Sequence, residues 1–282
     1  MPALITGANG QLGLELRKLL PDAIATDSAE LDITDAAAVQ RYDWSGVDAI
    51  YNSAAFTDVD GAETQADLAD RVNHLGAANL AEAARAHHIP LIHLSTDYVF
   101  DGTATEPYPV DAPLNPQSQY GKTKATGEQA VAQAPQHYII RTSWLYGDGN
   151  NFVRTMLRLG RERNELTVVN DQRGRPTSAL DLAQALVHLV RHKAPYGTYH
   201  FSNAGSVISW AEFAAAIFQI AKIDCKVTPI TTAEYLKGKT GIAPRPAYGA
   251  LDLASIEAVG ITPPDWHDSL ADYIRAELSK PA

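Results

Sequence analysis

The sequence has 282 residues, of which 45% are hydrophobic and 20% charged, proportions typical of a globular protein and not of a disordered chain. Its formal charge of −10 argues against a nucleic-acid partner, because non-specific binding to nucleic acid requires a basic surface. Cys225 is the only cysteine, which excludes an intrachain disulfide and a cluster of thiolate metal ligands.

The N-terminal residues lack the basic start and the long apolar core of a secretory signal. No apolar stretch approaches the ~20 residues that a membrane span needs. We therefore expect a cytoplasmic protein with no membrane partner.

Short apolar runs alternate with longer helix-like segments through the first two thirds of the chain. The runs predicted as strands cover residues 3–6, 23–27, 49–55, 91–95 and 138–143. The segments predicted as helices cover residues 11–20, 63–87 and 118–134. Near-continuous apolar strands that alternate with helices are typical of a parallel sheet covered on both faces. We therefore predict an α/β fold with a Rossmann-type, doubly wound parallel sheet.

Beyond residue 150 this alternation loosens, and proline-rich connections separate the predicted helices. These helices cover residues 152–163, 179–192, 210–221 and 269–279. We expect a smaller, interwoven C-terminal substrate lobe. The predicted NAD(P)-binding Rossmann domain covers residues 1–149 and about 173–202, and the predicted substrate-binding lobe covers about 150–172 and 203–282.

A glycine-rich turn, GANGQLG, follows the first predicted strand and opens the first predicted helix. Gly7, Gly10 and Gly13 allow the backbone to turn tightly and to approach a pyrophosphate at the positive end of the helix dipole. The same glycines could form a plain connection. Their place in the first strand-to-helix turn favours a dinucleotide site.

Polar and small residues follow the next two predicted strands. Asp27 can hydrogen-bond the adenosine ribose and would repel a 2′-phosphate, which favours NADH over NADPH. A solvated loop aspartate is the alternative reading. Asp32 and Ile33 follow at a spacing that could cover the adenine ring. The third strand ends in small residues that leave room for a ligand, although tight helix packing explains the alanines equally well.

Two tyrosine–lysine pairs have helical spacing, Tyr120 with Lys124 and Tyr235 with Lys239. Only the first pair follows a strand that ends in a hydroxyl, that of Thr96. In this fold the strand edge and the start of the next helix converge on the nicotinamide, so we expect these three side chains to meet there.

Reduction of a ketone requires a proton for its oxygen as well as a hydride for its carbon. A tyrosine can supply that proton, and we expect the ammonium of Lys124 to lower the pKa of Tyr120. Thr96 would hydrogen-bond the substrate oxygen. We interpret the second pair, Tyr235 and Lys239, as surface residues.

The glycine turn and the motifs STDYVFDG, YGKTK, RTSWLYG and NDQRGRPT, in this order, resemble the extended short-chain dehydrogenase/reductase superfamily. Within it, the chain is most similar to the dTDP-4-dehydrorhamnose reductase family. The resemblance covers nearly the whole chain and weakens after about residue 225. It implies reduction of the 4-keto group of dTDP-4-dehydro-L-rhamnose with NADPH or NADH, and a nucleotide-sugar substrate as the small-molecule partner.

The resemblance also implies roles for individual residues. Implied cofactor contacts are Gly10, Gln11 and Leu12 at the pyrophosphate, Asp27 at the ribose, Asp32 and Ile33 at the adenine, and Ala55, Phe56 and Thr57 beside them. Implied substrate contacts are Thr96, Asp97, Trp144, Asn151, Arg175 and Arg245. The alternatives are a core position for Trp144 and exposed ion pairs for the two arginines.

One departure from related enzymes is informative. Sugar-nucleotide dehydratases of the superfamily carry Thr-Asp-Glu where this chain has Thr96, Asp97 and Tyr98, so elimination of water is not expected. Some members of the reductase family are described as magnesium-linked homodimers that use acidic side chains. Glu15, Asp181 and Glu277 fall where such ligands could lie, but we assign no metal and leave both Mg²⁺ and the homodimer open.

Two further hypotheses remain open on the sequence alone. The chain could be another nucleotide-sugar 4-ketoreductase or an epimerase of the superfamily. It could also be a non-catalytic subunit, because the regulatory β subunit of methionine adenosyltransferase resembles this reductase family. An intact set of Thr96, Tyr120 and Lys124 favours an enzyme, since a binding subunit needs no proton donor.

Overall fold

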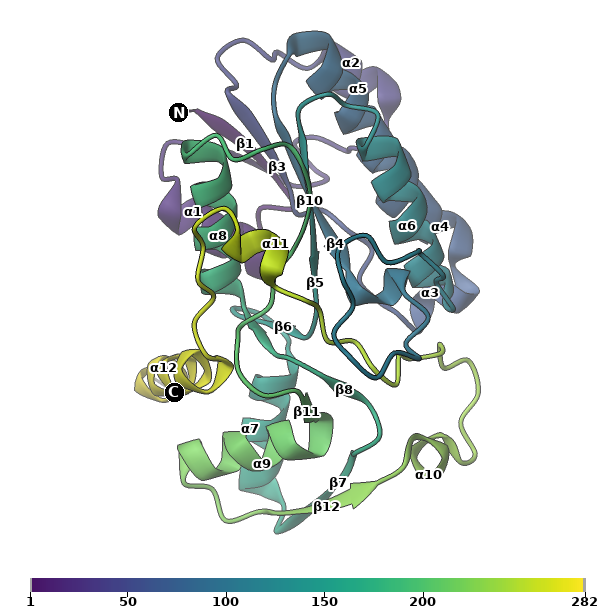
Figure 1. Ribbon diagram of the computed structural model, residues 1–282, viewed down its shortest axis with the longest axis vertical. Coiled ribbons are helices and arrows are strands. Elements are labelled where there is room, and N and C mark those ends of the chain that lie inside the picture. Colours follow the sequence, from purple (N-terminus) through teal and green to yellow (C-terminus); the bar gives the residue numbers. More distant parts are fainter. Residues whose placement is uncertain (1, 281–282) are drawn as a thin grey trace.

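A computed structural model describes residues 2–280 and contains one six-stranded parallel sheet (Figure 1). Its strands are β1 (Ala3–Thr6), β2 (Ile24–Thr26), β3 (Ala49–Asn52), β4 (Leu91–Thr96), β5 (His137–Thr142) and β10 (Gly197–His200). Their order across the sheet is β10-β5-β4-β3-β1-β2. The chain therefore reverses direction across the sheet between β1 and β3, which is where doubly wound folds bind ligands.

Helices cover both faces of this sheet, as Figure 1 shows. Because successive strand residues point to opposite faces, Leu4 and Ile5 enter different cores. The core with Ile5 contains α1 (Gln11–Leu19) and α8 (Ala179–Arg191). The core with Leu4 contains α2 (Ala36–Arg41), α5 (Ala77–His87) and part of α6 (Gln119–Val131). The predicted doubly wound α/β fold is confirmed.

The prediction of one continuous helix over residues 63–87 is wrong, because the structure divides this segment into several helices. The segment forms α3 (Gly61–Thr64), α4 (Ala66–Asp70), a π-helical turn η1 (Arg71–Gly76) and then α5. The extra residue in the π turn lets Asn73 reach out of the helix, where its amide accepts from the Phe56 backbone and donates to Thr123 of α6. A periodic run of alanines does not reveal such a side-chain contact.

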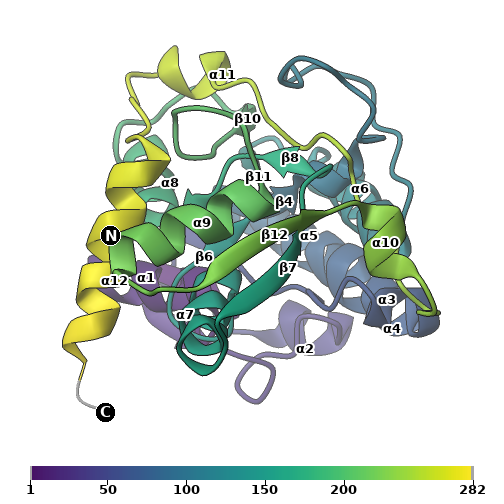
Figure 2. The same cartoon turned by 90° about the horizontal axis from the view of Figure 1, so that it is seen from below.

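A second group of elements lies beyond the carboxyl ends of the main strands (Figures 1 and 2). It contains α7 (Phe152–Glu162), α9 (Trp210–Ala221), α12 (Trp266–Ser279), and the parallel pair β7 (Glu165–Val169) and β12 (Lys226–Ile230). Phe213, Leu270 and Ile274 are among the buried residues that hold it together. The domain boundaries given above stay a prediction. Leu253 and Ile256, assigned there to the lobe, pack in the core of the main sheet.

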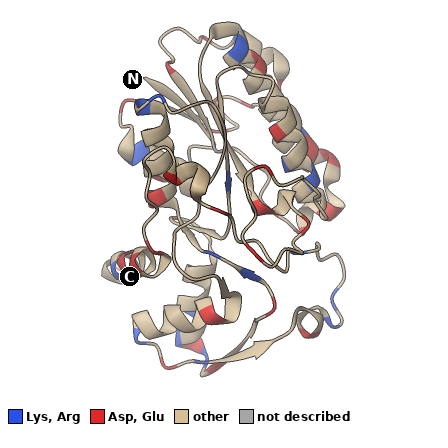
Figure 3. Cartoon of the chain, in the orientation of Figure 1, with Lys and Arg blue, Asp and Glu red and all other residues tan. Residues whose placement is uncertain are grey.

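The remaining elements are short. They are β6 (Leu145–Tyr146), β8 (Arg173–Gly174), β9 (Thr177–Ser178), β11 (Ile208–Ser209), α10 (Thr232–Leu236), α11 (Ala254–Glu257) and a 3₁₀ turn η2 (Asp97–Val99). Figure 3 shows acidic and basic residues interspersed over the helices, in contrast to the basic patch of a nucleic-acid-binding face. Among residues 2–280, no helix is both long enough and apolar enough to span a bilayer.

Candidate active site

A cavity of about 790 Å³ lies at the carboxyl ends of the central strands. Its lining includes residues that follow β1, β2, β3, β4 and β5, together with the start of α6 and the first residue of α9. This is the crevice at which the order of the strands reverses. Distant segments of the chain therefore meet in one cavity because parallel strands all end at the same edge.

The glycine turn forms the end of the cavity beside α1. Gly7 has φ +65, and a Cβ there would lie 2.6 Å from the Ala54 nitrogen. A Cβ on Gly13 would lie 2.3 Å from the Gly7 oxygen, so Gly13 is needed for packing, although it does not line the cavity. Gly10 caps α1 without a side chain. The helix terminus is thus bare and accessible, which fits a pyrophosphate.

Acidic side chains line the cavity beyond β2. A carboxylate oxygen of Asp27 accepts from the Ser28 nitrogen at 2.9 Å, and the Asp27 nitrogen donates to Glu30 at 2.9 Å. Asp32 accepts from the backbone and the hydroxyl of Thr34. Asp27, Asp32 and Ile33 all line the cavity, as do Ala55 and Thr57, whereas Phe56 does not.

Tyr120, Lys124 and Thr96 meet in the cavity as the sequence predicts. The N-cap Ser118 accepts from the Gly121 nitrogen at 3.1 Å and so places Tyr120 in the first turn of α6. Lys124 is 2% exposed, and its ammonium donates to the Leu94 carbonyl at 2.6 Å. The Thr96 hydroxyl donates to Asp97 at 3.0 Å and accepts from the Tyr98 backbone nitrogen at 3.2 Å.

Burial is the main cause of the pKa shifts of Tyr120, Lys124 and Asp97. It raises the pKa of Tyr120 to about 12, against the opposing hydrogen bond from Thr96. It lowers the pKa of Lys124 to about 8, although the charge of Glu128 acts in the other direction. It raises the pKa of Asp97 to about 7.

The expectation that Lys124 lowers the pKa of Tyr120 is therefore wrong for this state of the protein. The loss of water around the phenol outweighs any neighbouring charge, and the ammonium is directed at the Leu94 carbonyl. The consequence is that Tyr120 is a neutral phenol at physiological pH and holds a proton that it can donate.

A buried ion pair between Arg141 and Glu128 lies next to the elements that carry Thr96 and Tyr120. Arg141 of β5 donates to both carboxylate oxygens of Glu128 on α6, at 2.9 and 2.8 Å. Ser95, the neighbour of Thr96, donates to the same carboxylate at 2.5 Å. Because this network joins β4, β5 and α6, it fixes the helix that carries Tyr120 against the strand that carries Thr96. Removal of one partner would leave a buried charge unpaired.

The predicted substrate contacts do not all lie in the cavity. Thr96, Asp97 and Trp144 line it, whereas Asn151, Arg175 and Arg245 do not. Asn151 caps α7 and donates to the Gly147 carbonyl at 2.6 Å. Arg175 donates to the Leu251 carbonyl, and Arg245 pairs with Asp60 at 2.8 and 2.9 Å. These internal partners occupy Asn151 and Arg245, whereas the buried Nε of Arg175 has no hydrogen-bond partner within residues 2–280. The binding roles of all three side chains remain predictions.

The family follows from comparison with known proteins. The family model described as RmlD substrate binding domain matches residues 1–279. The chain belongs to this family.

Other members are similar over their whole length. The dTDP-4-dehydrorhamnose reductase of Aggregatibacter actinomycetemcomitans is 44% identical, over 97% of this chain and 98% of its own. A crystal structure of such a reductase from Clostridium acetobutylicum has a TM-score of 0.93 at 45% identity and covers 99% and 100% of the two chains. The Bacillus anthracis enzyme in complex with NADP has a TM-score of 0.92 at 40% identity and covers 98% and 100%. The family resemblance inferred from the motifs is confirmed.

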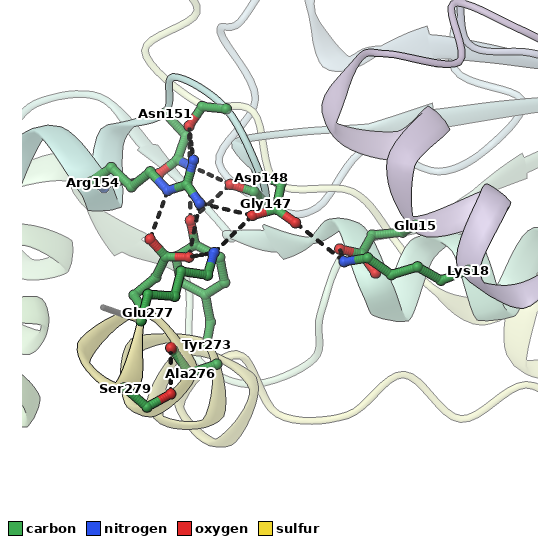
Figure 4. Close-up of polar contacts among 12 residues, drawn as sticks. Glu15, Lys18, Gly147, Asp148, Asn151, Arg154, Tyr273, Ala276, Glu277 and Ser279 are labelled. Carbon is green, nitrogen blue, oxygen red and sulfur yellow. Dashed lines mark hydrogen bonds and ion pairs between the residues drawn. The ribbon is translucent and has the colours of Figure 1, made fainter. Parts of the chain in front are cut away.

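The three carboxylates considered for magnesium in this RmlD-family chain have other partners, and Figure 4 shows Glu15 and Glu277 with theirs. Lys18 donates to Glu15 at 2.7 Å, and Glu277 pairs with Arg154 at 2.7 Å and with Lys280. Asp181 accepts instead from Asn203 and Ser269.

Asp148, which the sequence analysis did not single out, joins the other two acids by accepting from Lys18, Arg154 and Lys280 (Figure 4). These three acids are thus balanced by three bases. Within residues 2–280 no three potential ligands cluster into a metal site. Within a single chain these side chains therefore form ion pairs and not a set of metal ligands.

Sequence reasoning missed part of the cavity wall of this RmlD-family chain. Trp210 and the segment Asp148–Gly149–Asn150 line the cavity, but none of them lies in the motifs quoted above. Gln11 donates to the Asn150 carbonyl at 3.3 Å and so connects this segment to the glycine turn. The sequence marks this segment only by two glycines, Gly147 and Gly149, and such glycines are equally typical of an ordinary loop.

Proposed function

We propose that this chain reduces the 4-keto group of dTDP-4-dehydro-L-rhamnose to give dTDP-L-rhamnose. The observation that carries the proposal is the buried, neutral phenol of Tyr120 beside the Thr96 hydroxyl, in the same cavity as a bare helix terminus suited to a dinucleotide. The names of the similar reductases support the choice of sugar.

The side chains of this chain handle the proton of the reaction. A reduced nicotinamide, when bound, supplies a hydride to the carbonyl carbon. Tyr120 gives its phenolic proton to the carbonyl oxygen, which becomes the hydroxyl of the product. The Thr96 hydroxyl turns from Asp97 and donates its one hydrogen to the same oxygen as negative charge develops on it. Solvent then returns a proton to the Tyr120 phenolate.

Lys124 has two roles in this proposal. As an ammonium it can donate to the ribose hydroxyls of the nicotinamide nucleotide, because it is the only cationic side chain among the residues that line the cavity in the described part of the chain. It also stabilises the phenolate that Tyr120 becomes after the proton has left. Gly10, Gln11 and Leu12 hold the pyrophosphate through the helix terminus.

The acidic end of the cavity favours NADH over NADPH. A 2′-phosphate would meet the carboxylate of Asp27 in a segment without a lining cation. Direct binding measurements with NADH and NADPH check this preference. Asp27→Asn with Ser28→Arg should improve NADPH binding and weaken NADH binding. NADPH that binds the wild type as tightly as NADH would contradict the preference.

The function is tested by incubating the protein with dTDP-4-dehydro-L-rhamnose and each reduced cofactor. Loss of cofactor absorbance together with formation of dTDP-L-rhamnose supports the proposal. Turnover of a different 4-keto sugar nucleotide in preference to this one would favour the alternative, another nucleotide-sugar reductase or epimerase. Cofactor binding without turnover of any such sugar would favour a non-catalytic subunit. Activity should be unchanged by EDTA, because the acids of Figure 4 are already neutralised by bases.

A further inference from the structure

Two indole rings stack against each other in the wall of the cavity. Trp144 follows β5, and Trp210 is the first residue of α9. Their ring centroids lie 3.6 Å apart with an angle of 13° between the planes, and both residues line the cavity that contains Tyr120. The contact joins two segments that are distant in the chain and pack against the same core.

The backbone of Trp144 adopts a conformation that is unusual for its residue type. Its φ is +48, in the left-handed region, which is unfavourable for a residue with a Cβ. Among residues 2–280, the other non-glycine residues with positive φ are His88, Lys193 and Lys222, which lie one or two residues after the end of a helix. Left-handed residues are routine at helix ends but not in a strand-to-loop connection. Strain of this kind that lies in a cavity wall suggests a functional position.

Contacts with Gly174 and Phe152 fix the two rings in place. A Cβ on Gly174 would lie only 3.0 Å from Cε2 of Trp144, so the glycine is what allows the indole to settle against β8. Trp210 packs on Phe152 with centroids 4.6 Å apart, and a capping box of Ser209 and Glu212 fixes the helix turn that it begins. The pair is therefore a rigid surface.

The hydrogen bonding of the indole nitrogens distinguishes Trp144 and Trp210 from Trp44 and Trp266. Trp44 donates to the Val39 carbonyl and Trp266 to the Ser206 carbonyl, each at 3.1 Å. Trp44 and Trp266 are buried, at 5% and 7% exposure. The half-buried Trp144 and Trp210 have no acceptor for their N–H groups within residues 2–280. A tryptophan with an apolar face and a free donor is suited to a ligand that has both kinds of surface.

We propose that Trp210 is a substrate-contacting residue that forms, with Trp144, an aromatic wall for the hexose ring of the nucleotide sugar. This inference rests on the proposed function. The C–H face of a pyranose packs on indole, while its hydroxyls can accept from the two free N–H groups. By holding the ring, the wall places the carbonyl carbon and oxygen in a fixed position relative to Tyr120 and Thr96. The proposal predicts that Trp210 contacts the hexose and neither the nucleotide nor the cofactor.

The experiment compares the binding of dTDP-L-rhamnose with that of dTDP, which lacks the sugar, by calorimetry. Trp210→Ala should weaken dTDP-L-rhamnose binding and raise the KM of the keto sugar about tenfold. Its affinities for dTDP and NADH should stay at the wild-type values. Trp210→Phe retains packing on Phe152 and should show the same pattern with a smaller loss, which keeps the test decisive if the alanine variant does not fold.

Trp144→Ala should likewise raise the KM of the sugar nucleotide far more than that of the cofactor. Trp266→Phe is the matched control, because Trp266 lies in the same core as Trp210 but outside the cavity. It should lower thermal stability and leave all ligand affinities unchanged.

Two outcomes separate failure of the inference from failure of the proposed function. Equal losses for dTDP and dTDP-L-rhamnose in the Trp210 variants, or no loss for either, would overturn the aromatic wall while the wild type remains an active reductase. A wild-type protein that neither binds dTDP-L-rhamnose nor reduces the keto sugar would overturn the proposed function itself.

Discussion

Tyr120 with Lys124 and Tyr235 with Lys239 have the same spacing and opposite surroundings. Lys124 is 2% exposed and donates to the Leu94 carbonyl, beside a cavity that Tyr120 also lines. Tyr235 is 42% exposed, and the ammonium of Lys239 lies 3.3 Å from the centroid of its ring. Neither member of this second pair lines the cavity. The interpretation of Tyr235 and Lys239 as surface residues agrees with their positions.

The difference shows that burial beside a cavity, and not the spacing, makes a tyrosine–lysine pair suited to proton transfer. Burial raises the pKa of Tyr120 and lowers that of Lys124, so each group becomes sensitive to a ligand in the cavity. The surface pair provides a control for every substitution in the buried pair.

The largest difference should come from removal of the phenolic oxygens. Tyr120→Phe should lower kcat roughly 10²- to 10⁴-fold, because the substrate oxygen loses its proton donor, while NADH binding persists. Tyr235→Phe should leave kcat unchanged. Steady-state kinetics with a cofactor-binding titration measures both. Wild-type turnover in the Tyr120 variant would remove the phenol from the mechanism.

Removal of the two ammonium groups should give the next largest difference. Lys124→Met should lower kcat and weaken NADH binding together, by about 10-fold or more in each, because one cation serves both functions. Lys239→Met should alter neither. If only the rate changes in the Lys124 variant, the lysine does not hold the cofactor, and the role given to it above would be wrong.

The pH dependence of cofactor binding offers a smaller but more specific comparison. Because burial lowers the pKa of Lys124 to about 8, the ammonium is present below that pH and is lost as the pH rises through it. NADH affinity should therefore fall above pH 8 in the wild type and in Lys239→Met, but not in Lys124→Met. Calorimetric titrations between neutral and alkaline pH test this. An identical pH profile in all three proteins would show that another group titrates.

The smallest effect belongs to the surface pair itself. A cation over an exposed ring contributes ~0.5–1 kcal/mol at most. Lys239→Met should therefore lower the midpoint of thermal unfolding only slightly and leave the kinetics unchanged. A large loss of stability would mean that residues near α10 hold the fold together more than their exposure suggests.

Much of this site could be predicted from sequence because its signals are local. The glycine turn, the apolar strands and the carboxylate after β2 each follow from neighbouring residues, and the structure places Gly10, Asp27 and Tyr120 in one cavity. Phe56, Arg175 and Arg245 lie outside the lining. Their positions depend on partners such as Asn73, Leu251 and Asp60, which are distant in the chain.

The sequence by itself determined the fold class, the dinucleotide turn and the residue types that can move a proton, because periodicity and backbone geometry act over short distances. Tertiary structure alone decided which tyrosine–lysine pair is buried, that Trp210 stacks on Trp144, and that burial raises the pKa of Tyr120 above its ordinary value. Those outcomes depend on which distant segments exclude water from one another. No short segment of the sequence contains that information.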